Sequence, residues 1–213
     1  MQYPTISEYV KAIQDAGDNL DMSTEATNAE LNEAITDEFG VKYSKDGRKI
    51  LEAPKELDGT YSIRKETKII CDCAFGGCYS LRSLVLPDGV TRIGDSAFDD
   101  CSSLSSLVIP DSVTSIGNRA FNDCSSLSSL TIPNSITIIG DGVFRDCSSL
   151  SSLVLPNSVT SIGDGAFSGC SSLSRLVIPD SVTSIGEGAF RDCNFPDNLK
   201  QELISRFGDK IFG

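Results

Sequence analysis

Apolar positions in this chain recur with a fixed period of 23 residues. In the unit CSSLSSLVIPDSVTSIGNRAF, which spans residues 101–121, leucine, isoleucine, valine and phenylalanine keep the places they hold in the neighbouring units. A constant period between about 20 and 50 residues is the signature of a stacked repeat architecture. The sequence therefore predicts a solenoid in which each repeat forms one coil. The cysteines that mark the period are Cys78, Cys101, Cys124, Cys147, Cys170 and Cys193.

The first predicted strand of each repeat covers residues equivalent to 105–110. Leu107 and Ile109 alternate with Val108, and successive side chains of a strand point to opposite faces. We therefore expect Leu107 and Ile109 to face the core and Val108 to face the solvent. Pro110 ends the segment, because proline cannot donate to a β-ladder.

A second strand is predicted at residues 113–117, with Val113 and Ile116 directed inward. After it, Ala120 and Phe121 fit about one helical or 3₁₀ turn on the outer side, and Phe121 is expected to fill the core between layers. A repeat offers roughly six apolar side chains, each stabilising by about 1.5–3 kcal/mol when buried. Ordering its backbone costs about 1–2 kcal/mol per residue. A lone repeat is therefore unstable, and stacking is required.

The N-terminal segment 1–40 predicts a helical cap. One helix is expected from Thr5 to about Ala16 and another from about Thr27 to Glu38, each beginning with a T-x-x-E capping box. The terminal unit of a solenoid exposes the edge of its core, so covering that edge is the expected role of both helices.

Residues 41–77 are expected to form a hairpin and a degenerate first repeat. The pair Asp46 and Gly47 stands between two apolar pairs and predicts the hairpin turn. Residues 55–77 align with the repeat when they are read backwards from Cys78.

Five clear repeats follow over residues 78–193, and the tail 194–213 predicts a C-terminal cap. Its helix is expected from Phe195 to Phe207 and ends at Gly208. The helix is expected to cover the open edge of the last repeat. A partner-binding amphipathic helix is the alternative.

The repeats follow the pattern C-x-x-L-x-x-L-x-[LI]-P-x-x-[VI]-x-x-I-G-x-x-[AV]-F, which resembles the BspA-type, or Treponema-type, leucine-rich repeat. The segments VKYSKDGRKILEAP and FPDNLKQELISRFGDKIF are similar to flanks in Bacteroidetes members of that family. The resemblance covers residues 41–213. It implies an α+β, right-handed solenoid of leucine-rich type with its parallel sheet on a concave face. It also implies protein binding, and many members of the family are exported, surface-exposed adhesins.

The composition argues against several functional classes. The chain has 30 acidic and 18 basic residues and a net charge of −12, which disfavours nucleic acid and anionic membranes as partners. Histidine, the commonest general base and metal ligand, is absent from the sequence. The sequence also lacks a nucleophile elbow and a phosphate-binding loop. We expect a monomeric, non-enzymatic chain that binds protein, without cofactor, metal or small-molecule substrate.

The N-terminal residues MQYPTISEYVKAIQDAG lack the basic and apolar regions of a signal peptide, and no apolar run has the length of a membrane span. Two locations remain open. The family resemblance implies the cell surface or secretion, whereas the cytoplasm is expected if Met1 is the true start.

Six of the eight cysteines share one repeat position and are expected to form a column of free, buried thiols. Neighbouring layers bring them within disulfide distance, but equivalent side chains point in parallel rather than at each other. Cys71, Cys73 and Cys78 form a separate C-x-C-x₄-C cluster. A zinc site there lacks a fourth ligand, and a local disulfide is an alternative. The structural interpretation is that Cys71 replaces the glycine of the repeat.

A solenoid converts repeat positions into columns on its surface. The outward positions of the first strand predict a protein-binding sheet face, or, alternatively, β-formers and short hydroxyls that merely fit a sheet. The function predicted is a non-catalytic interaction module that is adhesin-like or contacts a host. A passive scaffold or spacer, or an intracellular binding module, is the alternative. The candidate residues are Arg82, Ser83, Val85, Ser106, Val108, Ser129, Thr131, Ser152, Val154, Arg175 and Val177.

Acidic columns are predicted beside this face. Turn formation and solubility are their expected roles, and calcium binding is the alternative. The columns follow the proline (Asp88, Asp111, Asn134, Asn157, Asp180), follow the glycine (Asp95, Asn118, Asp141, Asp164, Glu187) and precede the cysteine (Asp100, Asp123, Asp146, Asp192).

Overall fold

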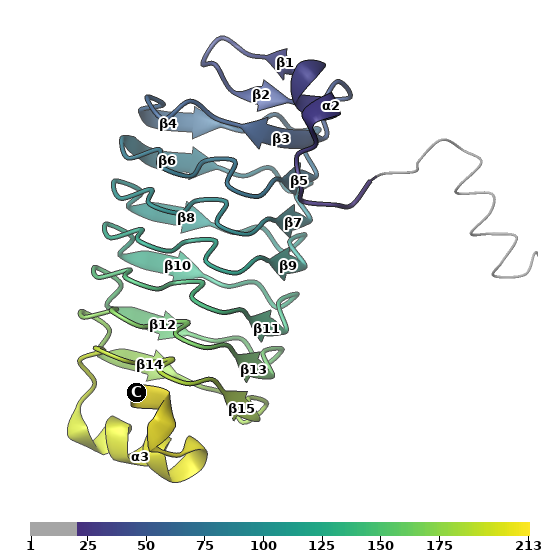
Figure 1. Ribbon diagram of the computed structural model, residues 1–213. Coiled ribbons are helices and arrows are strands. Elements are labelled where there is room, and N and C mark those ends of the chain that lie inside the picture. Colours follow the sequence, from purple (N-terminus) through teal and green to yellow (C-terminus); the bar gives the residue numbers. More distant parts are fainter. Residues whose placement is uncertain (1–20) are drawn as a thin grey trace, which may run out of the picture.

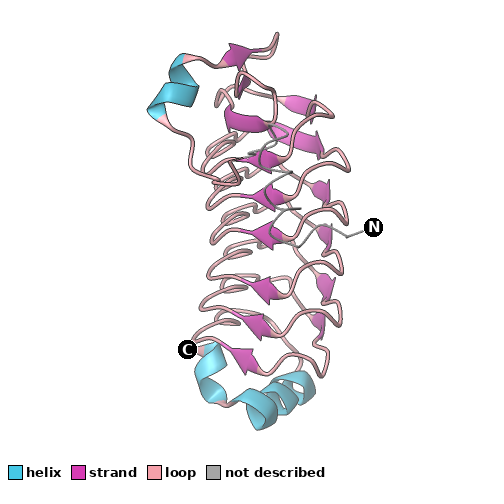
Figure 2. Cartoon of the chain, turned by 90° about the vertical axis from the view of Figure 1, so that its right-hand side faces the viewer, coloured by secondary structure: helices cyan, strands magenta, loops and turns pink. Residues whose placement is uncertain are grey.

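The protein is described here from a computed structural model of residues 21–213. These residues form a column of stacked coils, with a hairpin and a short helix at one end and a longer helix at the other (Figure 1). Turned by 90°, the column shows helices only at its two ends (Figure 2). The solenoid predicted from the period is confirmed. The helix expected from Thr5 to Ala16 lies outside the described residues.

Each coil contributes one strand to a first sheet side and one to a second. Neighbouring strands pair in parallel with a shift of one repeat, so that Leu107 lies beside Leu130 and Ile93 beside Ile116. The first side contains β4 (Gly59–Ser62), β6 (Leu81–Val85), β8 (Ser106–Val108), β10 (Ser129–Thr131), β12 (Ser152–Val154) and β14 (Arg175–Val177). The second contains β5 (Ile69–Ile70), β7 (Arg92–Ile93), β9 (Ser115–Ile116), β11 (Ile138–Ile139), β13 (Ser161–Ile162) and β15 (Ser184–Ile185).

Both sheet sides are interrupted at the coil of residues 124–146. On the first side β10 and β12 belong to separate sheets, and on the second side β9 and β11 do. In this coil Ile136 and Val143 replace the valine and alanine of its neighbours, and their extra methyl groups add volume to the core. The coils stay joined on the turn side, where the Phe121 amide donates to the Val143 carbonyl at 2.9 Å.

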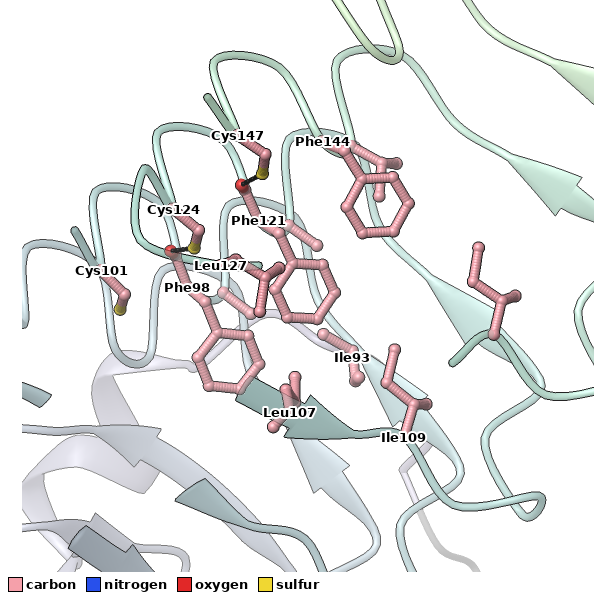
Figure 3. Close-up of a cluster of buried hydrophobic side chains, with 14 of the residues drawn as sticks. Ile93, Phe98, Cys101, Leu107, Ile109, Phe121, Cys124, Leu127, Phe144 and Cys147 are labelled. Carbon is pink, nitrogen blue, oxygen red and sulfur yellow. Dashed lines mark hydrogen bonds between the residues drawn. The ribbon is translucent and has the colours of Figure 1, made fainter. Parts of the chain in front are cut away.

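The predicted alternation of the first strand is confirmed. Leu107 and Ile109 are 3% and 4% exposed, whereas Val108 is 75% exposed. In the segment predicted as the second strand, Val113 precedes β9 and is fully buried, and Ile116 on β9 is half-buried. The apolar side chains of successive coils therefore form one continuous core along the column (Figure 3).

Phenylalanine rings form a stacked column through this core. Their centroids lie 5.2 to 5.7 Å apart and their planes are within 18° of parallel. Tyr61 covers Phe75 at one end of the column at 6.2 Å, and Phe195 meets Phe190 edge-on at the other at 5.4 Å. Stacked and edge-on ring pairs stabilise a folded protein by more than the burial of their apolar area alone accounts for. The column consists of Phe75, Phe98, Phe121, Phe144, Phe167 and Phe190.

The segment around each phenylalanine forms turns rather than the helical or 3₁₀ turn expected at Ala120 and Phe121. Arg119 and Asp123 have φ of 55° and 57°, and residues with positive φ interrupt a right-handed helix. The Phe121 amide also donates to the next coil, so it does not bond within a helical turn.

The N-terminal cap differs from the predicted one. Helix α2 (Asn28–Asn32) begins with the expected capping box at Thr27 but does not continue to Glu38. Its successor is strand β1 (Ile35–Thr36), which pairs antiparallel with β2 (Lys42–Tyr43). Leu31, Ala34 and Ile35 recur at the spacing of an apolar stripe on a helix, but the prediction was wrong from Ile35 on, because the backbone there bonds to a strand rather than within a helix.

The hairpin predicted at residues 41–57 is confirmed. Strand β2 pairs antiparallel with β3 (Lys49–Glu52), and Gly47 in the turn has φ of 72°. Strand β3 then pairs in parallel with β5, so the hairpin serves as the first layer of the stack. Residues 55–77 form the next coil, whose strands β4 and β5 pair with β6 and β7.

At the other end, helix α3 (Asp197–Phe207) confirms the predicted C-terminal helix, which ends at Gly208 with φ of 85°. A 3₁₀ helix, η1 (Asp209–Phe212), follows it and was not predicted. The Phe190 amide donates to the Ile211 carbonyl at 2.8 Å. Because earlier phenylalanine amides donate to the following coil, η1 accepts the bond that a further coil would accept. No helix in residues 21–213 has the length and apolarity of a membrane span.

Candidate functional site

The outward residues of the first sheet side form a strip, here called the long-sheet face, which crosses the break between β10 and β12. It runs along β6, β8, β10, β12 and β14 (Figure 1), and Val154 and Val177 on it are 67% and 57% exposed. It contains all eleven predicted residues: Arg82, Ser83, Val85, Ser106, Val108, Ser129, Thr131, Ser152, Val154, Arg175 and Val177. All of them are exposed except Ser83, which is half-buried. The structure brings these residues together on one surface.

The long-sheet face is nearly free of charge although the chain is acidic. Strands β4 to β14 of the first sheet side contain no aspartate or glutamate, and their only charged residues are Arg82 and Arg175. Acidic residues stand at the border where the strands end. Asp88, Asp111 and Asp180 follow the prolines there and are exposed.

The long-sheet face is only slightly concave. Behind it, neighbouring phenylalanine rings of the column are 5.2 to 5.7 Å apart. Neighbouring strands of a sheet lie about 4.8 Å apart, so the back of the stack is longer than the front by less than about 1 Å per coil. This difference bends the sheet only gently.

A pocket of about 160 Å³ continues the face between β14 and α3. Leu176, Val177 and Ile178 line it from the strand side, and Leu199, Glu202, Leu203 and Arg206 from the helix. The apolar residues of α3 could be recognised in the sequence. The pocket was not predicted, because it depends on how the helix docks.

The repeat geometry agrees with a known family. The family model described as a BspA type leucine rich repeat region matches residues 62–212 in six copies. The chain belongs to the BspA-type leucine-rich repeat family. The solved leucine-rich repeat protein of T. pallidum is 31% identical, with a TM-score of 0.68, and the match covers 85% of this chain and 95% of that one. The resemblance inferred from the repeat pattern is thereby confirmed.

Longer leucine-rich repeat proteins share the fold. One from Bacteroides ovatus is 26% identical with a TM-score of 0.61, over 76% of this chain and 48% of that one. One from Eubacterium ventriosum is 22% identical with a TM-score of 0.68, over 76% and 51%, which shows the fold alone. The present chain spans about half the length of these two proteins. A search of the curated proteins found no match.

The acidic column after the glycine has a structural role in this BspA-type solenoid. Asn118 Oδ1 accepts the Asp141 amide of the next coil at 2.9 Å, and Asp95 Oδ1 accepts the Asn118 amide at 2.8 Å. The same bond recurs from Asp72 to Glu187. Within residues 21–213, no group of three or more acidic or cysteine side chains is placed to hold a metal ion.

The acidic column before the cysteine forms turns. Its aspartates have φ between 57° and 62°, a region that aspartate and asparagine enter more readily than most residues. The members are Asp100, Asp123, Asp146 and Asp192.

The cysteine column of the BspA-type repeat consists of free thiols. Cys124 Sγ donates to the Phe98 carbonyl at 3.2 Å, and Cys147 Sγ makes the same bond to Phe121 (Figure 3). Burial raises the pKa of these thiols well above the ordinary value, as for Cys124. The parallel orientation predicted for the column is confirmed, and it keeps neighbouring sulfurs from facing each other.

Cys71 and Cys78 are also free and buried, whereas Cys73 is free and exposed. We expect one of the eight thiols to react rapidly with a thiol reagent in the folded protein, and all eight to react after denaturation. Titration with Ellman's reagent measures both numbers. Cys73→Ser should remove the rapid phase, and Cys101→Ser should leave it. Several rapid thiols in the native chain would contradict the buried column.

A groove of about 380 Å³ lies on the turn side of the last four coils. Three arginines and three acidic residues line it, so its charges balance and favour no single class of ligand. Its floor contains glycines, whose amides donate to the next coil or to η1. The charged residues are Arg119, Arg145, Arg191, Asp141, Asp164 and Glu187.

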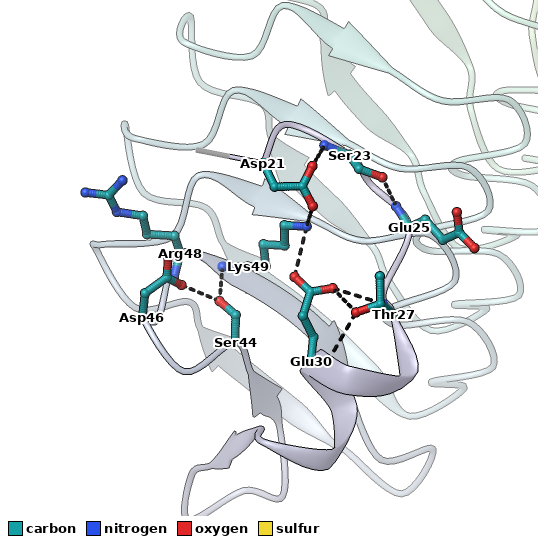
Figure 4. Close-up of polar contacts among 9 residues, drawn as sticks. All are labelled: Asp21, Ser23, Glu25, Thr27, Glu30, Ser44, Asp46, Arg48 and Lys49. Atoms are coloured by element: carbon teal, nitrogen blue, oxygen red, sulfur yellow. Dashed lines mark hydrogen bonds and ion pairs between the residues drawn. The ribbon is translucent and has the colours of Figure 1, made fainter. Parts of the chain in front are cut away.

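A buried lysine fastens the N-terminal segment to the solenoid (Figure 4). Lys49 on β3 is 3% exposed, and its Nζ lies 2.8 Å from Asp21 Oδ2 and 3.0 Å from Glu30 Oε1. The hydrogen bond from Lys49 lowers the pKa of Asp21. Burial alone would raise the pKa of Glu30, but bonds from Thr27 and Lys49 hold it below its ordinary value.

We expect Lys49→Met to lower the free energy of unfolding at pH 7 by about 1.5–3 kcal/mol, the range for hydrogen bonds to charged groups. The carboxyl pKa values are lower in the folded state, so the stabilisation is present at neutral pH and is lost as pH falls below about 4.5. Lys49→Met should therefore reduce the loss of stability that the protein shows between pH 7 and pH 3. Urea unfolding at pH 7 and pH 3 measures the effect.

Lys42→Met is the matched control for Lys49→Met. Lys42 lies 2.6 Å from Glu52 in an exposed pair, and such pairs contribute about 0–1 kcal/mol. An equal change in both variants would show that burial of Lys49 is not what makes its ion pairs stabilising.

Proposed function

We propose that this chain is a non-catalytic protein-interaction module, an adhesin-like domain exposed at a bacterial surface, which binds protein through the long-sheet face. The observation that carries the proposal is a row of outward valine side chains in four of five successive coils, with Thr131 at the same position in the middle coil. Val85, Val108, Val154 and Val177 are all more than half exposed, although the chain fills its core with the same residue type. A contiguous exposed apolar strip marks a site of interaction in soluble proteins.

The form of the face supports protein rather than small-molecule binding. It is long and shallow, whereas ligand sites for small molecules are concave and enclose most of the ligand. Its mixture of valine, threonine and serine, with arginine at both ends, provides apolar contact and hydrogen bonding together. The surface location in the proposal rests on the exported members of the family.

The uniformity of the middle coils favours a second candidate function, a passive spacer. Ser106, Ser129 and Ser152 repeat one residue where a binding site for a specific protein usually varies. A spacer requires only that the coils stack, so it predicts that substitutions on the long-sheet face leave function unchanged.

Beads coated with the protein and tested on arrays of cell-surface and extracellular-matrix proteins distinguish the two candidates. The double variant Val108→Glu with Val154→Glu is expected to reduce binding by at least about tenfold, because it places carboxylates in the apolar strip. The matched control is Ser115→Glu with Ser184→Glu, which adds the same charge to exposed strand positions on the second sheet side. Equal loss in both double variants, or no binding by the native chain, would contradict the proposal.

A further inference from the structure

We propose that the long-sheet face docks on the same face of a second copy of this chain, with a twofold axis parallel to the solenoid. The inference rests on the proposed function, because it names the partner of that same surface. It is carried by the placement of charges around the valine column and by the flatness of the face.

Opposite charges are spaced symmetrically about the valine in the coil of residues 78–100. Arg82 precedes Val85 by three residues, and Asp88 follows it by three. A twofold axis along the solenoid reverses the strand direction and preserves the order of the coils. Val85 of one copy then faces Val85 of the other. Arg82 of each copy faces Asp88 of the other.

The last coil has a similar arrangement, with the arginine one residue closer to the valine. Arg175 precedes Val177 by two residues, and Asp180 follows it by three. In the coil of residues 101–123, serine occupies the position equivalent to Arg82, so Asp111 faces the hydroxyl of Ser105. The middle coils carry asparagine and serine at the same positions. The arrangement therefore pairs opposite charges in two coils and opposes no like charges.

The other face-to-face arrangement has its axis along the strands and reverses the order of the coils. Arg82 would then face Arg175 of the other copy. Asp88 would face Asp180. Like charges in direct opposition disfavour an interface, and opposite charges set its register. The charge pattern of the long-sheet face thus selects one of the two twofold orientations.

The shape and size of the face set the strength of the contact. A face with only gentle curvature allows sheet-on-sheet packing. Strand spacing and rise give about 600 Å² per copy, below the ~800 Å² of a standard interface. Net charge of −12 on each copy opposes association as well. We therefore expect a weak dimer, with a dissociation constant on the order of tens of micromolar.

The charged border is available for this contact. Asp180 Oδ1 lies 3.8 Å from Arg206 Nη2 within the same chain, but the Asp180 side chain remains fully exposed. Arg82, Arg175 and Asp88 are exposed as well.

Sedimentation velocity of the full chain from about 5 to 500 µM tests self-association. The native chain and the control variant Ser115→Glu with Ser184→Glu are expected to shift from monomer to dimer. Val108→Glu with Val154→Glu is expected to stay monomeric. A native chain that is monomeric throughout would overturn the second copy as partner. If that double variant still lost binding to another protein, the proposed function would stand.

Charge reversal tests the orientation. Arg82→Asp with Asp180→Arg puts like charges opposite each other in both end coils under the proposed axis, but opposite charges under the axis that reverses the order of the coils, so it is expected to be monomeric. Arg82→Asp with Asp88→Arg exchanges the two charges of one coil and should dimerise within about tenfold of the native affinity. Dimerisation of the first variant with native or higher affinity, or a monomeric second variant, would overturn the proposed axis.

Discussion

We expect Phe121→Ala to lower the free energy of unfolding by about 3–5 kcal/mol, which is the range for truncating a buried phenylalanine. Phe121 is fully buried, and its ring lies 5.2 Å from that of Phe98 and 5.6 Å from that of Phe144. The substitution removes contacts with two coils at once. The surrounding backbone cannot close the cavity, because the Phe121 amide is held by the Val143 carbonyl at 2.9 Å.

Urea unfolding followed by circular dichroism measures this loss. Val108→Ala is the control, since Val108 is exposed and its truncation should change stability by less than about 0.5 kcal/mol. A loss below about 1 kcal/mol for Phe121→Ala would mean that the stacked rings do not hold the coils together.

Gly163→Ala is expected to destabilise by about 3 kcal/mol, although it adds only one methyl group to an exposed turn. The new Cβ would lie 2.3 Å from Asp141 Oδ1 and 2.7 Å from both Asp141 N and Gly140 C. These atoms belong to the preceding coil. Asp141 Oδ1 also accepts the Asp164 amide at 2.8 Å, so the methyl group would both separate the coils and break their bond.

Gly165→Asn is the matched control, two residues further along the chain. Gly165 has φ of 58°, but the nearest atom to a Cβ placed there is Ser168 Cβ at 3.9 Å. Ser96 and Arg119 hold the same backbone conformation in earlier coils, with φ of 52° and 55°. We expect Gly165→Asn to change stability by less than about 1 kcal/mol. Equal losses in the two variants under urea would show that close approach at Gly163 is not the cause.

The interior of the stack was predictable because each coil repeats one local pattern. The alternation of Leu107, Val108 and Ile109 predicted which side chains are buried, and the shared position of the cysteines predicted parallel thiols. The turn at Phe121 was predicted wrongly as helical, because its amide bonds to another coil. A backbone hydrogen bond between coils cannot be recognised from the sequence of a single repeat.

The two ends of the solenoid were less predictable, because their structure depends on which hydrogen bonds and apolar surfaces the terminal coils leave uncovered. The helix at α2 was predicted to be too long, because Ile35 lies at helical spacing from Leu31 although it belongs to strand β1. The 3₁₀ helix η1 is needed only because Phe190 has no following coil to accept its amide. For the candidate site, the outward positions of Val108 and Val154 followed from strand alternation, and their binding role stays a prediction. The pocket beside α3 required the docked helix.

The bonds between coils join each coil to the one made just before it, which bears on how the chain is synthesised. Cys124 Sγ donates to the carbonyl of Phe98, made 26 residues earlier, and the Asp141 amide bonds to Asn118, made 23 residues earlier. Each coil leaving the ribosome therefore meets a finished layer with its bonding groups in place. The hairpin at residues 41–57 supplies the first such layer. Growth of the solenoid then follows the order of translation, one turn at a time.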